Sequence, residues 1–292
     1  MKIFITGATG GLGQKLIPLL NSEKYELVLL SIDPHNPFSQ NNVTFIQGDL
    51  LAPEKYQEYI KDVDLIIHLA AITHTNNKAL YYRVNTEGTK ILIDLAEQYD
   101  VKRFIFFSTR AISESGGAYS DSKNKAEDIV RNSKIMWTIV RPAEIYGISE
   151  GEAITKLLKN IENMTFIPII GDGSYKIAPV YVDDIINALI KIIDNNKTTK
   201  KFYTLAGPEE ISYLDFVKKT LKFKNRKKTL IKIPIFLFFL LAKIIKFMMP
   251  NKPIIVEDQI PRLLCLKSAD NSLAKEDFDY NPHFITQIIK SN

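Results

Sequence analysis

The sequence predicts an α/β fold built on a doubly wound parallel sheet. An apolar run at the start of the chain leads into a glycine-rich turn, and short apolar runs then alternate with helical patterns. Alternation of this kind is typical of βαβ units, which form parallel sheets through right-handed crossovers. The 292 residues are enough for one such domain and a smaller lobe.

The expected strands are apolar runs of three or four residues. They lie at Lys2–Ile5, Leu27–Leu30, Val43–Ile46, Leu65–Ile67, Phe104–Phe107 and Trp137–Val140. The helical patterns between them lie at Gly11–Asn21, Glu54–Ile60, Glu87–Tyr99 and Tyr119–Asn132. Together these elements predict a Rossmann-type, dinucleotide-binding domain over residues 1–145.

The alternation loosens after Arg141-Pro142, and loops are marked at residues 171–173 and at Gly207-Pro208. We therefore expect residues 146–292 to form mainly a substrate-binding lobe that is smaller and mostly helical. The chain is expected to return to the first domain near residues 175–206, through Pro179–Ile193 and Phe202–Leu205.

Three glycines follow the first strand with the spacing of a dinucleotide site. Gly7 would let the chain turn sharply, Gly10 would leave room for phosphates, and Gly13 would let the next helix lie close to the sheet. Because the helix N-terminus also carries a positive dipole end, this turn is suited to a pyrophosphate. An ordinary glycine turn is the alternative.

A second motif places Tyr119 and Lys123 four residues apart, on one face of a helix. A lysine ammonium near the phenol would lower the tyrosine pKa from its ordinary value of about 10, which suits an acid/base catalyst. A surface Tyr–Lys pair would have the same spacing. Ser108 and Thr109 end a buried strand, where ligands bind in doubly wound sheets. The glycine turn, these hydroxyls and the Tyr–Lys pair together favour catalysis.

With these motifs the sequence resembles the extended short-chain dehydrogenase/reductase family of nucleotide-sugar epimerases, dehydratases and reductases. The resemblance runs from Lys2 to about Gly207. Its further motifs are Gly48-Asp-Leu50, His68-Leu-Ala-Ala71, Val84–Thr89, Arg141–Gly147 and Pro179–Asp184. It implies that Tyr119 is the acid/base, that Thr109 with its neighbour Ser108 orients the substrate oxygen, and that Lys123 also holds the nicotinamide ribose.

The resemblance also implies an NAD or NADP site. Its expected residues are Gly7, Thr9, Gly10, Gly11, Leu12, Gly13, Ser31, Asp33, Asp49, Leu50, Leu69, Ala70, Ala71, Asn85, Tyr119, Lys123 and Pro142. Ser31 stands where the family has an acid that selects NAD, and Asp33 is the nearest substitute, so the choice between NAD and NADP stays open. Structural alternatives are a turn cap for Asp49 and a helix N-cap for Asn85.

The composition limits the chemistry and the compartment. The single cysteine, Cys265, excludes an internal disulfide and fits a reducing, cytoplasmic location. The first residues show no signal peptide, and the four histidines lack metal-ligand spacing. The net charge is a mild +5. We expect no metal and no nucleic-acid partner, and the family implies a homodimer formed through the Tyr119 helix and the helix before it.

The C-terminal part holds a basic stretch, Lys218–Lys232, and an apolar segment, Ile233–Met249, that Lys243 and Lys246 interrupt. The apolar segment is shorter than the roughly 20 residues of a membrane-spanning helix. We favour a helix packed into the substrate lobe or a dimer contact over the alternative, a peripheral membrane contact through residues 218–249. Arg262 is a candidate to bind a substrate diphosphate.

The function predicted from these observations is NAD(P)-dependent hydride transfer at a carbinol or keto carbon of a nucleotide sugar, for example in polysaccharide biosynthesis. Epimerase, dehydratase and 4-ketoreductase outcomes stay open. One alternative is a non-catalytic NAD(P)H-binding accessory subunit, similar to that of respiratory complex I. Another is a reductase of a hydrophobic alcohol, similar to hydroxysteroid dehydrogenases.

Overall fold

A computed structural model describes residues 1–20, 23–148, 153–248 and 256–291. Its centre is a seven-stranded parallel sheet with the order β11-β6-β5-β4-β1-β2-β3. The strands of this sheet are β1 (Lys2–Thr6), β2 (Glu26–Ser31), β3 (Val43–Gln47), β4 (Leu65–His68), β5 (Arg103–Phe107), β6 (Met136–Pro142) and β11 (Lys201–Leu205). Chain order reverses between β1 and β4, so the switch point of the sheet lies at their carboxyl ends.

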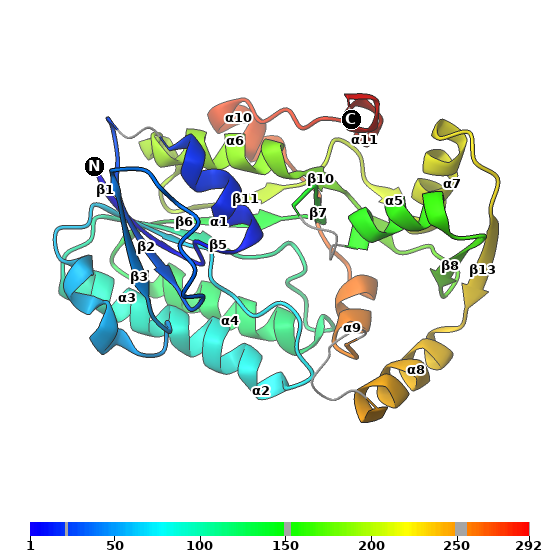
Figure 1. The fold of residues 1–292 in the computed structure, drawn as a ribbon, viewed down its shortest axis with the longest axis horizontal. Helices are drawn as coiled ribbons and strands as arrows, with labels where there is room; N and C mark the ends of the chain where they lie inside the picture. Colours follow the sequence, from blue (N-terminus) through cyan, green and yellow to red (C-terminus); the bar gives the residue numbers. More distant parts are fainter. Residues whose placement is uncertain (21–22, 149–152, 249–255, 292) are drawn as a thin grey trace.

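Helices cover both faces of this sheet (Figure 1). One face carries α3 (Gly88–Gln98) and α4 (Gly117–Asn132), with α2 (Lys78–Tyr81) and the π-helix η4 (Tyr82–Glu87) beside them. The other face carries α1 (Gly11–Leu16), the 3-10 helix η1 (Ile17–Leu19), α6 (Val182–Ile193) and α10 (Ser272–Phe278). The predicted doubly wound fold is therefore confirmed.

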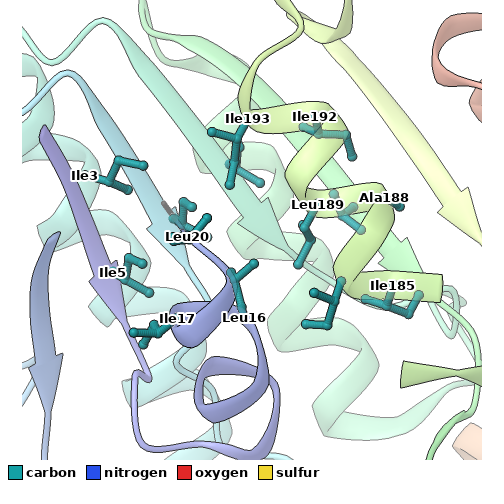
Figure 2. Close-up of a cluster of buried hydrophobic side chains, with 14 of the residues drawn as sticks. Ile3, Ile5, Leu16, Ile17, Leu20, Ile185, Ala188, Leu189, Ile192 and Ile193 are labelled. Carbon is teal, nitrogen blue, oxygen red and sulfur yellow. The ribbon is translucent and has the colours of Figure 1, made fainter. Parts of the chain in front are cut away.

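The strands bury both faces, which is why they read as apolar runs without alternation. In β1, Ile3 and Ile5 belong to the core under α1 and α6, whereas Phe4 belongs to the core under α3 and α4. Figure 2 shows the first of these cores, between β1, the α1–η1 segment and α6. Its labelled side chains are Ile3, Ile5, Leu16, Ile17, Leu20, Ile185, Ala188, Leu189, Ile192 and Ile193.

All six predicted strands are confirmed, as are the helices that contain Leu92 and Tyr119. The helix predicted over Glu54–Ile60 is wrong: this segment forms two 3-10 turns, η2 (Pro53–Lys55) and η3 (Gln57–Ile60). The helix predicted over Gly11–Asn21 is α only to Leu16, because Pro18 cannot donate the backbone hydrogen bond that a continuing helix needs. Asn21 lies outside the described residues.

The segments after β6 build the second part of the molecule and the return to the sheet. Their short strands are β7 (Ile145–Tyr146), β8 (Phe166–Ile170), β9 (Lys176–Ile177), β10 (Val180–Tyr181), β12 (Ile211–Ser212) and β13 (Thr229–Ile233). Their helices are α5 (Ala153–Asn163), α7 (Tyr213–Phe223), α8 (Ile235–Met248), α9 (Gln259–Leu264) and α11 (Ile285–Ser291), with the 3-10 turn η5 (Asn196–Thr198). Strands β8 and β13 pair in parallel, and β13 leads into α8 (Figure 1).

The helix α8 differs from the expectation for the apolar segment. We expected it to pack into the substrate lobe, but Phe236 is 68% and Phe247 is 89% exposed, and only Ala242 is buried among its described side chains. The prediction of a helix packed into the lobe is therefore wrong, whereas a dimer contact, the other form of that expectation, stays a prediction. Met249, the last residue of that segment, lies outside the described residues. No helix in the described part of the chain is long and apolar enough to cross a membrane.

Candidate active site

The glycine turn lies at the switch point of the sheet and is closely packed. Gly7 has a positive φ of 72°, and a Cβ there would lie 2.7 Å from the Ala70 backbone nitrogen. A Cβ at Gly13 would lie 2.3 Å from the Ala8 carbonyl oxygen, so glycine lets α1 approach the turn. Because only glycine fits this cradle, the residues present fit a dinucleotide pyrophosphate.

We expect Gly7→Ala to weaken both folding and dinucleotide binding. A Cβ in this left-handed conformation meets backbone atoms that cannot move aside, so the free energy of unfolding should fall by at least about 1–3 kcal/mol. The matched control is Gly171→Ala, because Gly171 also has a positive φ but its Cβ would approach only Ile235 side-chain atoms, at 3.3 Å. Urea unfolding and NADH fluorescence measure the two effects, and equal losses in both variants would contradict the close approach.

The end of β2 holds the glycine turn through hydroxyl groups. The Thr9 and Ser31 hydroxyls are hydrogen-bonded at 2.6 Å, and the Asp33 backbone N–H donates to Ser31 Oγ at 3.0 Å. Asp33 is exposed, and one of its carboxylate oxygens accepts from the His35 backbone N–H. Asp33 thus lies two residues beyond Ser31, and the Ser31 hydroxyl links its backbone to Thr9 in the glycine turn.

Asp49 and Leu50 lie in the turn after β3. Asp49 Oδ1 accepts from the Leu51 N–H at 3.0 Å, which confirms the turn-cap interpretation. Leu50 is buried against α3, since a Cβ on Gly88 would lie 2.6 Å from Leu50 Cδ2. Its side chain therefore fills the core.

Residues after β4 line the other side of the switch point. The backbone of Leu69 and Ala70 hydrogen-bonds to Thr6, and Ala71 follows directly. The N-cap interpretation of Asn85 is wrong: its side chain lies inside η4 and bonds both the N–H and the C=O of Ile72. Asn85 thereby fixes the path of the chain after Ala71.

His68 is a structural residue. Its ring nitrogens are hydrogen-bonded to the hydroxyls of Thr6 and Thr89, and it stacks on Phe106. Burial, with the nearby charge of Lys123, lowers its pKa to about 3, so the ring is neutral at physiological pH.

The predicted catalytic residues come together at the carboxyl end of β5. Tyr119 is 7% exposed, and the side chain of Thr109 is one of the groups that lower the pKa of its hydroxyl. Lys123, one turn further along α4, donates from Nζ to the Phe107 carbonyl at 2.8 Å and lies 4.1 Å from the centre of the Phe106 ring. Helix α4 therefore presents both side chains to the strand end that carries Thr109. Pro142 is the last residue of the neighbouring strand β6.

The electrostatics of this group differ from the expectation. Burial raises the pKa of Tyr119, and the groups that oppose this rise are Arg262 and Thr109. Burial also lowers the pKa of Lys123 to about 7, against a smaller opposing effect of Glu127. The expectation that the Lys123 ammonium lowers the Tyr119 pKa is wrong for this arrangement; Arg262 has that effect.

Ser108 is turned away from Tyr119. Its hydroxyl donates to Glu127 at 2.5 Å, and the same fully buried carboxylate is ion-paired with Arg141. These contacts tie α4 to the ends of β5 and β6. Of the two residues, Thr109 is the one that affects the Tyr119 pKa. Glu127 lies four residues after Lys123 on the same helix face, a spacing that is visible in the sequence.

The short helix α9 brings two more residues to the start of α4. Asp258 is 4% exposed and accepts from the backbone N–H groups of Ala118 at 2.7 Å and Tyr119 at 3.1 Å. Four residues on, the Arg262 guanidinium lies 4.5 Å from the centre of the Tyr119 ring and donates to the Thr73 carbonyl. Asp258 was not predicted, because its contact spans about 140 positions of sequence.

We expect Arg262→Met to raise the pKa of Tyr119, because the substitution removes a cation that lowers it. The limb of the kcat/KM pH profile that reports the tyrosine should then move to higher pH, whereas Arg262→Lys, which keeps the charge, should move it less. A rise in KM without a shift of the profile would instead indicate that Arg262 acts by binding substrate.

Comparison with known proteins gives the family. A model of the NAD dependent epimerase/dehydratase family matches residues 3–206. Ceramide reductase of Caulobacter vibrioides is 31% identical over 185 residues, which are 62% of this chain and 57% of that protein, so the chain spans little more than half of it. UDP-glucose 4-epimerase of Vibrio cholerae is 22% identical over 96% of this chain and 90% of its own length.

Solved structures of other proteins have the same fold. The structure of UDP-glucuronic acid 4-epimerase from Bacillus cereus, in complex with UDP-glucuronic acid and NAD, matches with a TM-score of 0.75 and 22% identity over 99% of this chain and 96% of that chain. The family match covers more than two thirds of the sequence and includes the glycine turn, Thr109, Tyr119 and Lys123. This chain belongs to the NAD-dependent epimerase/dehydratase family.

Proposed function

We propose that this chain is an NAD-dependent enzyme that interconverts a carbinol and a keto carbon of a nucleotide sugar. The observation that carries the proposal is the buried Tyr119, whose pKa Arg262 and Thr109 lower against the opposite effect of burial, at the same sheet edge as the glycine cradle. A protein that only bound the dinucleotide would not need a positioned acid/base, so an accessory subunit is the weaker interpretation.

The contacts of Tyr119, Thr109 and Lys123 support a role for each of them in this reaction. The dinucleotide, when bound, supplies the hydride acceptor and donor. Tyr119 moves the proton of the substrate hydroxyl, and Thr109 orients that oxygen. Lys123 is fixed by the Phe107 carbonyl and is the group that binds the ribose. Glu127 and Asp258 position α4 from its middle and its N-terminus.

We propose NAD as the cofactor, held by the glycine turn and by Asp33. The family is NAD-dependent, and Asp33 offers an exposed carboxylate beyond Ser31, suited to a ribose hydroxyl and unfavourable for a 2′-phosphate. Asp49, Leu69, Ala70, Ala71, Asn85 and Pro142 complete the proposed cofactor site, with residues 1–145 as its domain and residues 146–292 mainly as the substrate lobe.

A reductase of a hydrophobic alcohol is the second candidate. The similarity to ceramide reductase and the exposed apolar helix α8 favour it. Both candidates use the same Tyr119 chemistry, so the substrate panel has to distinguish them.

The test is incubation of the protein with NADH or NAD and a panel of nucleotide sugars, their 4-keto forms and long-chain keto compounds, followed by mass-resolved chromatography. An isomer formed without net cofactor loss assigns an epimerase, and loss of water assigns a dehydratase. A gain of two hydrogens with cofactor oxidation assigns a reductase. Conversion of only the long-chain compounds would overturn the nucleotide-sugar proposal in favour of the second candidate.

Further parts of the proposal are a homodimer formed through α3 and α4, a cytoplasmic location and a place in polysaccharide biosynthesis. Light scattering measures the mass in solution, and a monomeric mass at micromolar concentration would contradict the dimer.

A further inference from the structure

The outward face of α8 is an apolar surface that the rest of the described chain leaves uncovered. Its exposed side chains are spaced four residues apart along the helix. Among the described side chains of α8, only Ala242 is buried. We call these side chains the α8 face; they are Phe236, Leu237, Leu240, Leu241, Ile244, Phe247 and Met248, each between 39% and 89% exposed.

A helix whose apolar stripe points away from the core is the reverse of an ordinary surface helix. Soluble proteins rarely leave so many neighbouring large apolar side chains exposed unless the patch binds something. A helix of 14 residues spans only about 21 Å, less than the roughly 30 Å of a bilayer core. The α8 face therefore suits a helix that lies on a membrane surface rather than one that crosses it.

The charge around the α8 face identifies the surface. Between Asp215 and Glu257 the sequence contains eleven lysines and arginines and no acidic residue. Several of these cations are paired, as Lys224 is with Glu162. Lys232, in the strand that leads into α8, and Lys243, on α8 itself, are exposed and form no ion pair with any residue that the structure describes. The lysines before β13 lie at the opposite end of that strand from α8 (Figure 1). A cationic rim beside an apolar stripe is complementary to anionic lipid headgroups over acyl chains.

We propose that this protein docks onto anionic lipid bilayers through the α8 face, with α8 lying in the interface and Lys232 and Lys243 on the headgroups. This docking goes beyond the proposed reaction and does not depend on it. A second copy of the chain would also cover an apolar face, but it would bring the same cations against one another.

The test is co-sedimentation of the full chain with two kinds of vesicle. One is phosphatidylcholine alone, and the other is phosphatidylcholine with roughly 30% phosphatidylglycerol, which makes the vesicle surface strongly negative. We expect binding to the anionic vesicles that weakens at high salt. Phe236→Ser/Phe247→Ser should lower it by at least about tenfold, and Lys232→Gln or Lys243→Gln by about fivefold each. The matched control is Leu19→Ser/Met136→Ser, since both residues are more than half exposed and lie outside the α8 face.

Two results would overturn the proposal. One is failure of the wild-type chain to bind anionic vesicles at low salt. The other is equal vesicle binding by the wild type and Phe236→Ser/Phe247→Ser. If the wild type binds no vesicles and this double variant dissociates a dimer seen by light scattering, the face belongs to a second copy. None of these measurements uses turnover, so they can fail while the proposed reaction holds.

Discussion

Tyr119→Phe should lower kcat by about 10²- to 10⁴-fold, because it removes the hydroxyl that exchanges a proton with the substrate. The ring would keep its edge contact with Tyr81 and its place under Arg262, so we expect folding and NADH binding to change little. Initial rates with the substrate found in the panel, together with thermal unfolding and NADH fluorescence, measure the three quantities.

The matched control is Tyr82→Phe. The Tyr82 hydroxyl lies near the same helix, where burial and Asp121 raise its pKa, and both residues are outside the predicted catalytic group. This control should keep its rate within a factor of about two, a bound far inside the losses expected for an acid/base group. Retention of the wild-type rate by Tyr119→Phe would contradict the catalytic assignment for nucleotide sugars and hydrophobic alcohols alike.

The sheet was predictable from the sequence because its strands are buried on both faces. Such strands require unbroken apolar runs, and the glycine turn placed the first of them without ambiguity. The helices were less predictable. In Glu54–Ile60, the apolar spacing resembles a helix, but Pro53 begins the first of two separate 3-10 turns.

The types of the catalytic residues and their order along the chain were predictable from the sequence, but the shifts of their pKa values were not. The spacing of Tyr119 and Lys123 puts them on one helix face, yet burial and the Phe107 carbonyl decide what the ammonium contacts. Asp258 and Arg262 reach the site by a return of the chain that no local pattern shows. Hydropathy likewise identified α8 as apolar without indicating which side of the molecule it faces.

Glu144→Gln should lower the free energy of unfolding by about 3–5 kcal/mol. Glu144, which follows β6, is ion-paired with Arg110 at 2.7 Å and Lys267 at 3.1 Å, and those two side chains are 2% and 4% exposed. The glutamine would leave the buried Lys267 without its carboxylate, and Arg110 with only its longer ion pair to Glu210 at 3.4 Å. Urea unfolding measures the loss. The matched control is Glu58→Gln in the exposed Lys61–Glu58 pair, which should cost less than about 1 kcal/mol.

The same cluster makes part of the stability depend on pH. Burial alone would raise the pKa of Glu144, but Lys267 and Arg110 outweigh it and hold that pKa below its ordinary value of 4.5. A carboxyl whose pKa is lower in the folded state stabilises the fold above its unfolded pKa, and this contribution disappears as the pH falls through the folded pKa. The stability difference between the wild type and Glu144→Gln should therefore be largest near neutral pH and shrink below about pH 4.5. A difference that stays constant from pH 7 to pH 3 would show that Glu144 acts through packing, because a protonated Glu144 carboxyl no longer offsets the charges of Lys267 and Arg110.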